Sequence, residues 1–231
     1  MANSTDSRPD PTCALLFDLD GTLVDTAPDL AGALNGILRE HGREALALDD
    51  VKHLVGDGAV AMIERGFEAT GGLPDTLENL RLRFLEIYAA TLTANTRPYP
   101  GVVATLENFH AAGHPMAVCT NKPQAPSEAI LEGLDLVRFF GATAGGDRFP
   151  VRKPDGGHIT GLLELIGAGT GAAVMIGDSM NDVAAARAAD IPVIAVSYGY
   201  TVVPAAEFGA DAVVDSFDEI PAALATLPGF G

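Results

Sequence analysis

Short apolar runs recur along the 231-residue chain, and segments with helical spacing of apolar residues separate most of them. The strand-like runs lie at residues 13–17, 116–119, 142–144, 173–176, 193–196 and 212–214. Between them, residues 102–113 space apolar side chains at helical intervals, and residues 180–190 are rich in alanine. Strands that alternate with helices predict βαβ units, and hence an α/β fold whose parallel sheet is covered by helices on both faces.

The alternation is interrupted directly after the first strand. From Thr26 to about Arg97 no segment has a convincing strand pattern, and two groups of apolar residues follow a helical period. These groups are Leu30, Leu34, Ile37 and Leu38, and Leu77, Leu80, Phe84, Ile87 and Tyr88. The first helix opens with TAPD, where Thr26 can cap and Asp29 can reach back in a capping box. We therefore predict an all-helical insertion at residues 26–97, ended by the rigid linker RPYPG, between the two parts of a core at residues 1–25 and 98–231.

The composition is typical of a globular protein. Hydrophobic residues make up 48% of the chain, which is enough for a sizeable core, and the longest apolar runs, such as 191–196, are too short to cross a membrane. The polar start MANSTDSRPDPT has no apolar signal region, so we expect a cytoplasmic protein with residues 1–12 as a loose tail. A monomer and a homodimer both stay open. The net charge of −17 repels phosphate backbones and argues against nucleic acid or a membrane as partner. A small phosphorylated metabolite is compatible with this net charge if local cations or a metal bind its phosphate.

The two cysteines are predicted to be buried free thiols. Cys13 and Cys119 lie far apart in the sequence, and each adjoins an apolar strand-like run. This placement favours a packing role over a disulfide or a catalytic pair.

Polar side chains follow three of the predicted strands. The first strand ends at Asp18 and Asp20, the second at Thr120, Asn121 and Lys122, and the fourth at Asp178 and Asp182. Asp18 and Asp20 leave the strand end on one side, and two like charges about 5 Å apart repel by roughly 3 kcal/mol at an effective dielectric near 20. The pair therefore requires a cation or a shared proton. Because ligands bind beyond the carboxyl ends of the strands in open α/β sheets, these residues predict one site.

Single members of this set also have structural explanations. Asp182 lies three residues after Ser179, which is a capping-box position. Thr120 could satisfy a turn, and a lysine such as Lys153 in VRKPDG is ordinarily solvated.

Taken together, DLDGT, Thr120, Lys153 and GDSMND resemble the four motifs of the haloacid dehalogenase superfamily, in their order and spacing over nearly the whole chain. Within it the chain looks like the phosphoglycolate phosphatases, through DLDGTLVDTAPDL, CTNKP, VGDGAVAMIERGF and SYGYT. The resemblance implies a Rossmann-like sheet of order 3-2-1-4-5 with a helical cap inserted after the first strand. One departure is KPDGG, where Gly156 stands at the second proline of the K-P-x-P that the family often has.

Such a phosphatase would use its carboxylates in two ways. Asp18 would be the nucleophile that attacks phosphorus to give an aspartyl phosphate, and Asp20 would protonate the leaving oxygen and later take a proton from water. Thr120 would hydrogen-bond a phosphoryl oxygen, and Lys153 would offset charge between Asp18 and the phosphate.

The cofactor that these residues imply is Mg²⁺, which prefers oxygen ligands. The expected ligands are Asp18, the main-chain carbonyl of Asp20, and Asp178. Asp182 would orient Lys153 or a metal-bound water.

The substrate that the resemblance implies is a small phosphate monoester, 2-phosphoglycolate. Its carboxylate needs a cation besides Lys153, and Arg65 and Lys122 are the candidates, with Asn121 as a further substrate-binding residue. The alternative for Arg65 is a solvated helix residue paired with an acid such as Glu68.

Four other functions can be compared with this one. A dehalogenase of this family lacks the second aspartate, so Asp20 argues against it. A β-phosphoglucomutase-like phosphomutase or another sugar-phosphate phosphatase stays open, because it depends on cap residues that the sequence does not place. A phospho-accepting receiver domain also combines acidic strand ends with a Thr and a Lys, but it needs no lid, whereas an enzyme that excludes water does.

Overall fold

A computed structural model of the chain describes residues 13–201 and 203–227, so the predicted tail at residues 1–12 lies outside the described residues. Six parallel strands form one sheet of order β5-β4-β1-β6-β7-β8. They are β1 (Ala14–Phe17), β4 (Met116–Cys119), β5 (Ala142–Ala144), β6 (Ala173–Gly177), β7 (Val193–Val196) and β8 (Ala212–Val214). The predicted order 3-2-1-4-5 is confirmed, and the sixth predicted strand, β8, extends the sheet beyond β7.

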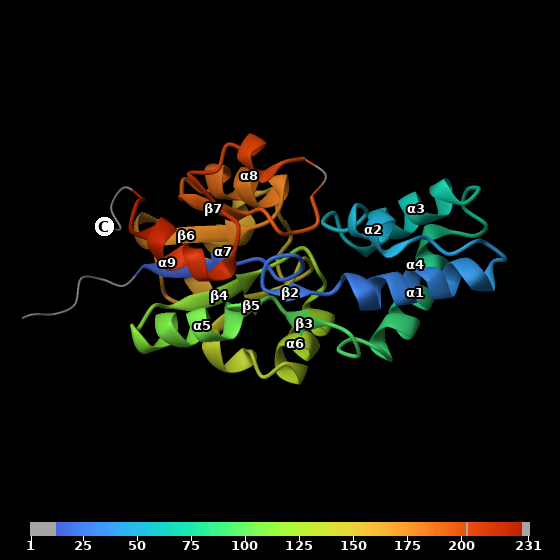
Figure 1. The fold of residues 1–231 in the computed structure, drawn as a ribbon, viewed down its shortest axis with the longest axis horizontal. Coiled ribbons are helices and arrows are strands. Elements are labelled where there is room, and N and C mark those ends of the chain that lie inside the picture. Colours follow the sequence, from blue (N-terminus) through green and yellow to red (C-terminus); the bar gives the residue numbers. More distant parts are fainter. Residues whose placement is uncertain (1–12, 202, 228–231) are drawn as a thin grey trace, which may run out of the picture.

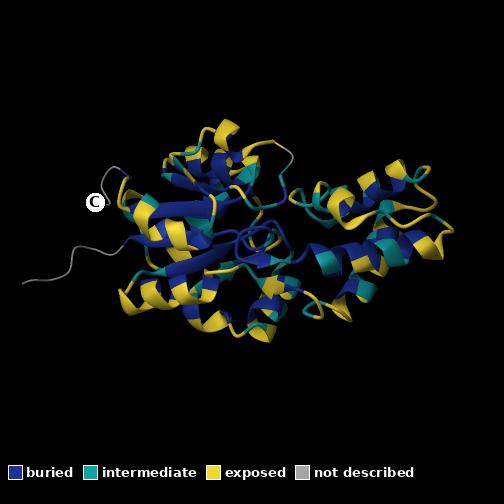
Figure 2. Ribbon diagram, viewed as in Figure 1, coloured by how far each residue is buried: buried dark blue, intermediate teal, exposed yellow. Residues whose placement is uncertain are grey.

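Helices cover both faces of this sheet (Figure 1). Leu15 and Phe17 of β1 belong to a core cluster with residues of α5 (Val102–Ala111), α6 (Gln124–Gly133) and α9 (Ile220–Leu224). The alternate residues Ala14 and Leu16 pack on the other face with α7 (Gly156–Leu165) and α8 (Met180–Ala188). Figure 2 shows the central strands buried and the outer faces of the helices exposed. Within residues 13–201 and 203–227, no helix combines the length and apolar character that a membrane span needs.

Four further helices, here called the helical insertion, lie between β1 and β4 in the sequence. They are α1 (Ala27–Glu40), α2 (Leu48–Lys52), α3 (Ala59–Ala69) and α4 (Leu77–Ala89), and they share a separate hydrophobic cluster. Figure 1 shows them grouped beside one end of the sheet. The two connections to the rest of the chain pair as short antiparallel strands, β2 (Val24–Asp25) and β3 (Arg97–Pro98). The first residues of the predicted linker RPYPG thus form a strand.

The first connection is not held by the predicted capping box. The Thr26 hydroxyl oxygen accepts no capping bond from the main-chain N–H groups of α1, and the hydroxyl instead donates to Asp20 Oδ1 at 2.7 Å. The hydroxyl oxygen of Tyr200 accepts from the main-chain N–H groups of Thr26 and Ala27 at 2.7 and 3.0 Å. The N–H groups at the start of α1 are therefore capped by Tyr200, a residue more than 170 positions later in the sequence. The capping-box prediction was wrong.

Asp29, the other member of that predicted box, joins the two connections. Its Oδ2 accepts from the main-chain N–H groups of Asn95 and Thr96 at 2.9 and 2.8 Å, and from the Thr96 hydroxyl at 2.8 Å. The carboxylate is only 2% exposed. Asp29 thus fixes the start of the helical insertion to its end.

Candidate active site

The carboxyl ends of β1 and β4 and the helical insertion enclose a cavity of about 50 Å³. It is lined from the sheet side by Asp18, Asp20, Thr120, Asn121 and Lys122, and from the insertion by residues that include Leu30, Met62, Phe84 and Tyr88. Side chains from two strand ends that lie about a hundred residues apart in the sequence therefore meet, because β1 and β4 are neighbours in the sheet.

Asp18, Lys153 and Asp182 form a buried chain of charges. Lys153 Nζ lies 3.0 Å from Asp18 Oδ1 and 2.5 Å from Asp182 Oδ1. The other oxygen of Asp182 accepts from the main-chain N–H and the hydroxyl of Ser179 at 3.0 and 2.6 Å. Asp182 therefore completes the helix cap and holds the lysine at the same time, and Lys153 is not a solvated residue.

The carboxylates near this lysine carry more negative charge than it balances. Burial raises the pKa of Asp18 to about 7, although Lys153 opposes this effect. Burial and the neighbouring Asp18 also raise the pKa of Asp178 well above its usual range. Burial alone would lower the pKa of Lys153, but Asp18 and Asp182 outweigh it and raise that pKa, so the ammonium stays charged. A bound cation would relieve the excess negative charge.

The same carboxylates fit a divalent metal. Oxygen atoms of Asp18, Asp178 and Asp182 lie within 4.8 Å of one another, and an all-oxygen donor set suits Mg²⁺. Both oxygens of Asp182 are already engaged by other side chains. Asp18 and Asp178 are therefore the carboxylates best placed to hold the ion.

The fold leaves room for the Asp178 carboxylate. A Cβ atom at Gly21 or Gly199 would lie 2.3 or 2.2 Å from Asp178 Oδ2, so either position excludes a side chain. Gly21 also has a φ of +82°, which disfavours other residues. Asp178 Oδ2 accepts from the main-chain N–H of Tyr200 at 2.8 Å. The SYGYT segment thus packs against the acidic cluster.

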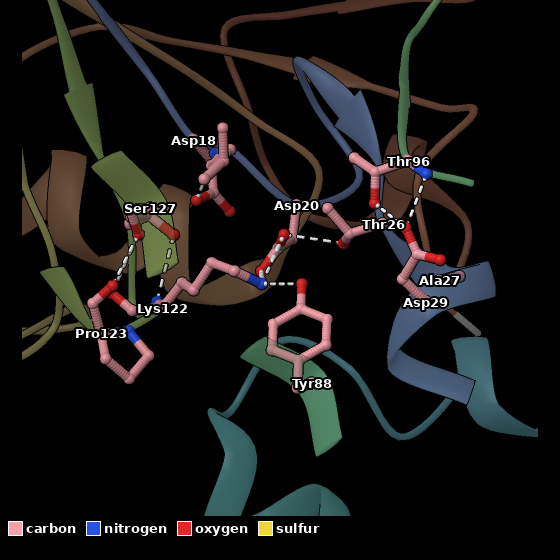
Figure 3. Close-up of polar contacts among 12 residues, drawn as sticks. Asp18, Asp20, Thr26, Ala27, Asp29, Tyr88, Thr96, Lys122, Pro123 and Ser127 are labelled. Atoms are coloured by element: carbon pink, nitrogen blue, oxygen red, sulfur yellow. Dashed lines mark hydrogen bonds and ion pairs between the residues drawn. The ribbon is translucent and has the colours of Figure 1, made fainter. Parts of the chain in front are cut away.

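The Asp20 side chain contacts Lys122 (Figure 3). Lys122 Nζ lies 3.2 and 3.1 Å from the two oxygens of Asp20, and it donates to the hydroxyl of Tyr88 at 2.8 Å. Burial opposes the charge on Lys122, but Asp20 and Tyr88 raise its pKa to about 12. Sequence analysis missed Tyr88 as a residue of the site, because its spacing on α4 is that of a core residue.

The residues before Lys122 are held by main-chain groups. Thr120 Oγ1 accepts from the Lys122 N–H at 3.1 Å, which leaves the hydroxyl proton of Thr120 available. Asn121 Nδ2 donates to the carbonyl of Lys153 at 3.0 Å. Its Oδ1 is buried and has no hydrogen-bond partner among the described residues.

Arg65 lies apart from the first cavity. It lines a neighbouring cavity of about 270 Å³ together with Asp20 and Asp178. Its Nη2 lies 2.5 Å from Asp57 Oδ2, so its acidic partner is Asp57 and not Glu68. Asn181 of α8 donates to Asp57 Oδ1 at 3.0 Å. Arg65 is therefore held at the rim, where the helical insertion meets the core.

Neither cysteine takes part in this chemistry. Cys13 and Cys119 are both buried and free, as predicted. Burial raises the pKa of the Cys13 thiol to about 11 and that of Cys119 to about 12, so neither forms a thiolate near neutral pH.

Comparison with known proteins agrees with this geometry. The family model described as haloacid dehalogenase-like hydrolase matches residues 15–196. The chain is 46% identical to a phosphoglycolate phosphatase of Caulobacter vibrioides over 92% of this chain and 91% of the relative, and 44% identical to one of Agrobacterium fabrum over 94% of each. Among solved structures, a predicted phosphoglycolate phosphatase from Haemophilus somnus superposes with a TM-score of 0.86 at 30% identity, over 91% of this chain and 97% of that one.

These similarities confirm the prediction of an enzyme and argue against a receiver domain. The matched range, residues 15–196, spans both the strand-end motifs and the helical insertion. The chain belongs to the haloacid dehalogenase-like hydrolases, as a phosphatase similar to the phosphoglycolate phosphatases.

Proposed function

We propose that this enzyme is a Mg²⁺-dependent phosphatase that hydrolyses 2-phosphoglycolate through an aspartyl phosphate on Asp18. The observation that carries the proposal is the placement of a buried, lysine-paired carboxylate, Asp18, in the same cavity as a second carboxylate, Asp20. A nucleophile and a proton donor next to one small cavity are the groups that a two-step hydrolysis of a phosphate ester requires.

Contacts to one carboxylate oxygen of Asp18 orient the other oxygen for attack. Its Oδ1 accepts from the Leu19 N–H at 2.7 Å and from Lys153 at 3.0 Å. We assign the attack on phosphorus to Oδ2, while Lys153 reduces the repulsion between this carboxylate and the phosphate. The available hydroxyl proton of Thr120 is assigned to a phosphoryl oxygen.

Proton transfer is assigned to Asp20. In the first step it protonates the ester oxygen as the bond from phosphorus to that oxygen breaks. In the second it takes a proton from the water that attacks the aspartyl phosphate, so it ends each cycle as it began. Mg²⁺ held by Asp18, Asp178 and the main-chain carbonyl of Asp20 would supply positive charge for the phosphate dianion.

The helical insertion is proposed to act as a cap. We assign residues 26–97 to this cap and residues 1–25 and 98–231 to the catalytic core, with β2 and β3 as the crossing between them. The cap contributes apolar residues to the cavity, such as Leu30 and Met62. Such a lid excludes water from the acyl phosphate until the product alcohol has left.

The small cavity suits a small ester, and the carboxylate of 2-phosphoglycolate needs a cation of its own. Lys122 donates to Asp20 and Tyr88, and an ammonium has only three protons. Arg65 has five N–H donors, and its side chain is 44% exposed at the rim. Asp20 lines both this cavity and the neighbouring one that Arg65 lines, so an ester at Asp20 can extend toward Arg65. We therefore assign the substrate carboxylate to Arg65, and Asn121 to the cavity wall beside the ester.

The test is phosphate release from a panel of small phosphate esters, with and without Mg²⁺. Arg65→Ala should lower kcat/KM for 2-phosphoglycolate by about 30-fold, or about 2 kcal/mol, and should hardly change it for 4-nitrophenyl phosphate, which has no carboxylate. Arg83→Ala is the matched control, because Arg83 is an exposed insertion arginine paired with Glu40 and Glu86. Preferred turnover of a sugar phosphate, or conversion to an isomer without phosphate release, would contradict the proposal in favour of a sugar-phosphate phosphatase or a phosphomutase.

The cytoplasmic location, the lack of nucleic-acid and membrane partners, and the monomeric or homodimeric state stay predictions. The location and the excluded partners rest on the charge and apolar pattern of the sequence.

A further inference from the structure

Tyr88 brings a polar atom of helix α4, in the helical insertion, into contact with the predicted catalytic residues. It lies on α4, is 2% exposed, and stacks on Phe84 with ring centroids 5.6 Å apart. Its hydroxyl is nevertheless aimed out of the apolar cluster toward the strand ends, where it accepts from Lys122 Nζ at 2.8 Å (Figure 3). An apolar residue would fill the same position on α4 without this contact.

Lys122 has little freedom beyond this contact. Its side chain is 4% exposed, and its ammonium lies 3.1–3.2 Å from both oxygens of Asp20 and 4.7 Å from the centroid of the Tyr88 ring. A buried ammonium needs a partner for each proton. Without the Tyr88 hydroxyl, one N–H group of Lys122 loses its acceptor. The ammonium is then expected to shift toward a different acceptor.

The position of Asp20 depends on that ammonium. Its carboxylate receives one hydrogen bond from Thr26 at the crossing into the helical insertion and the remaining ones from Lys122. A shift of Lys122 would free Asp20 Oδ2, which accepts from Lys122 at 3.1 Å, and let the carboxylate rotate. Proton transfer to a leaving oxygen is sensitive to such a rotation, because donor and acceptor must lie within hydrogen-bond reach.

We propose that Tyr88 is a positioning residue, whose hydroxyl holds Lys122 against Asp20 so that Asp20 is aligned for proton transfer when the helical insertion covers the strand ends. The inference rests on the proposed role of Asp20 and goes beyond it. It makes the alignment of a core carboxylate depend on a side chain of the insertion, and it explains why α4 places a hydroxyl-bearing ring at this position.

The experiment compares two carboxylate-free esters, phenyl phosphate and 4-nitrophenyl phosphate, of which phenyl phosphate has the poorer leaving group. Tyr88→Phe keeps the ring under Lys122 and removes only the hydroxyl. It should lower kcat about tenfold on phenyl phosphate and about twofold or less on 4-nitrophenyl phosphate, with little change in KM. Tyr198→Phe is the matched control: it removes a tyrosine hydroxyl that donates to the carbonyl of Thr22 at 2.9 Å, so any loss should be equal on the two esters.

A second pair of variants separates this inference from the proposed role of Asp20. Asp20→Asn should itself show a larger loss on phenyl phosphate, and adding Tyr88→Phe to it should cause no further loss that depends on the leaving group. If Asp20→Asn loses activity equally on both esters, the proposed function and the inference fall together. If Asp20→Asn behaves as expected but Tyr88→Phe loses activity equally on both esters, or loses none, the inference alone is overturned. Unfolding curves for each variant identify a loss caused by instability.

Discussion

Replacing Lys153 by methionine tests the charge chain at the centre of the candidate site. The change keeps an unbranched side chain of similar length but removes the ammonium that lies between Asp18 and Asp182. All three side chains are buried, with Lys153 2% and Asp182 0% exposed. Asp182 therefore has no exposed surface at which water could replace the lost partner.

The size of the effect follows from this burial. Removing one partner of a buried ion pair typically costs about 3–5 kcal/mol, because the other charge is left without compensation. Lys122→Met removes the other buried lysine, whose partner Asp20 is 14% exposed in its side chain and keeps the Thr26 hydroxyl. That control should lose less, about 1–3 kcal/mol. Lys153→Met should also lower kcat by about 10²–10³-fold, as expected for a lost group that stabilises transition-state charge.

The assay is urea unfolding in a chelating buffer, followed by steady-state phosphate release with Mg²⁺ restored. The chelator removes any metal that could replace the missing positive charge. A Lys153→Met variant as stable as Lys122→Met, or one that turns over at nearly the rate of the unmodified enzyme, would refute the assignment of Lys153 to the centre of the site.

Two further predictions concern the crossing and the metal. Asp29→Ala should lower the free energy of unfolding by about 3 kcal/mol, because the buried N–H groups of Asn95 and Thr96 lose their acceptor. Burial raises the pKa of Asp29, but these hydrogen bonds outweigh burial and hold that pKa below its usual value. The loss of stability should therefore be the same at about pH 7 and about pH 5, and disappear only as the pH falls below about 4. A loss that shrinks between pH 7 and pH 5 would argue against this role of Asp29. Chelation should stop turnover, and Mg²⁺ should restore it. Gly199→Ala should raise the Mg²⁺ concentration for half-maximal rate about tenfold, because its Cβ would lie 2.2 Å from Asp178. Full turnover in excess chelator, or an unchanged Mg²⁺ dependence in the variant, would contradict the metal assignment.

The sheet was predictable because its strands are short, mostly apolar runs, and the four central strands are buried throughout. The runs at residues 116–119, 142–144, 193–196 and 212–214 match the observed strands residue for residue. The polar residues that follow these strands were predictable as a group, because a parallel sheet brings the carboxyl ends of its strands to one edge. Asp182 also fits its sequence pattern, because its two oxygens serve the helix cap and Lys153 together.

The connections between the insertion and the core could not be predicted in this way. Thr26 and Asp29 have the spacing of a capping box, yet the hydroxyl of Thr26 binds Asp20, and Asp29 binds main-chain groups 66 and 67 residues away. A local pattern contains no information about partners that distant. Tyr88 was missed for a related reason, since only its ring follows the helical period and its hydroxyl meets a lysine 34 residues further along.

The most direct test of the central claim is to trap the covalent intermediate. The enzyme would be mixed with 2-phosphoglycolate and Mg²⁺ and quenched with borohydride during turnover, which reduces an aspartyl phosphate to homoserine. Peptide mass spectrometry would then locate the reduced residue. The account predicts homoserine at position 18 only, dependent on both substrate and Mg²⁺, and none in Asp18→Asn. Rapid turnover with no reduction at Asp18, or reduction at another aspartate such as Asp20 or Asp178, would contradict it.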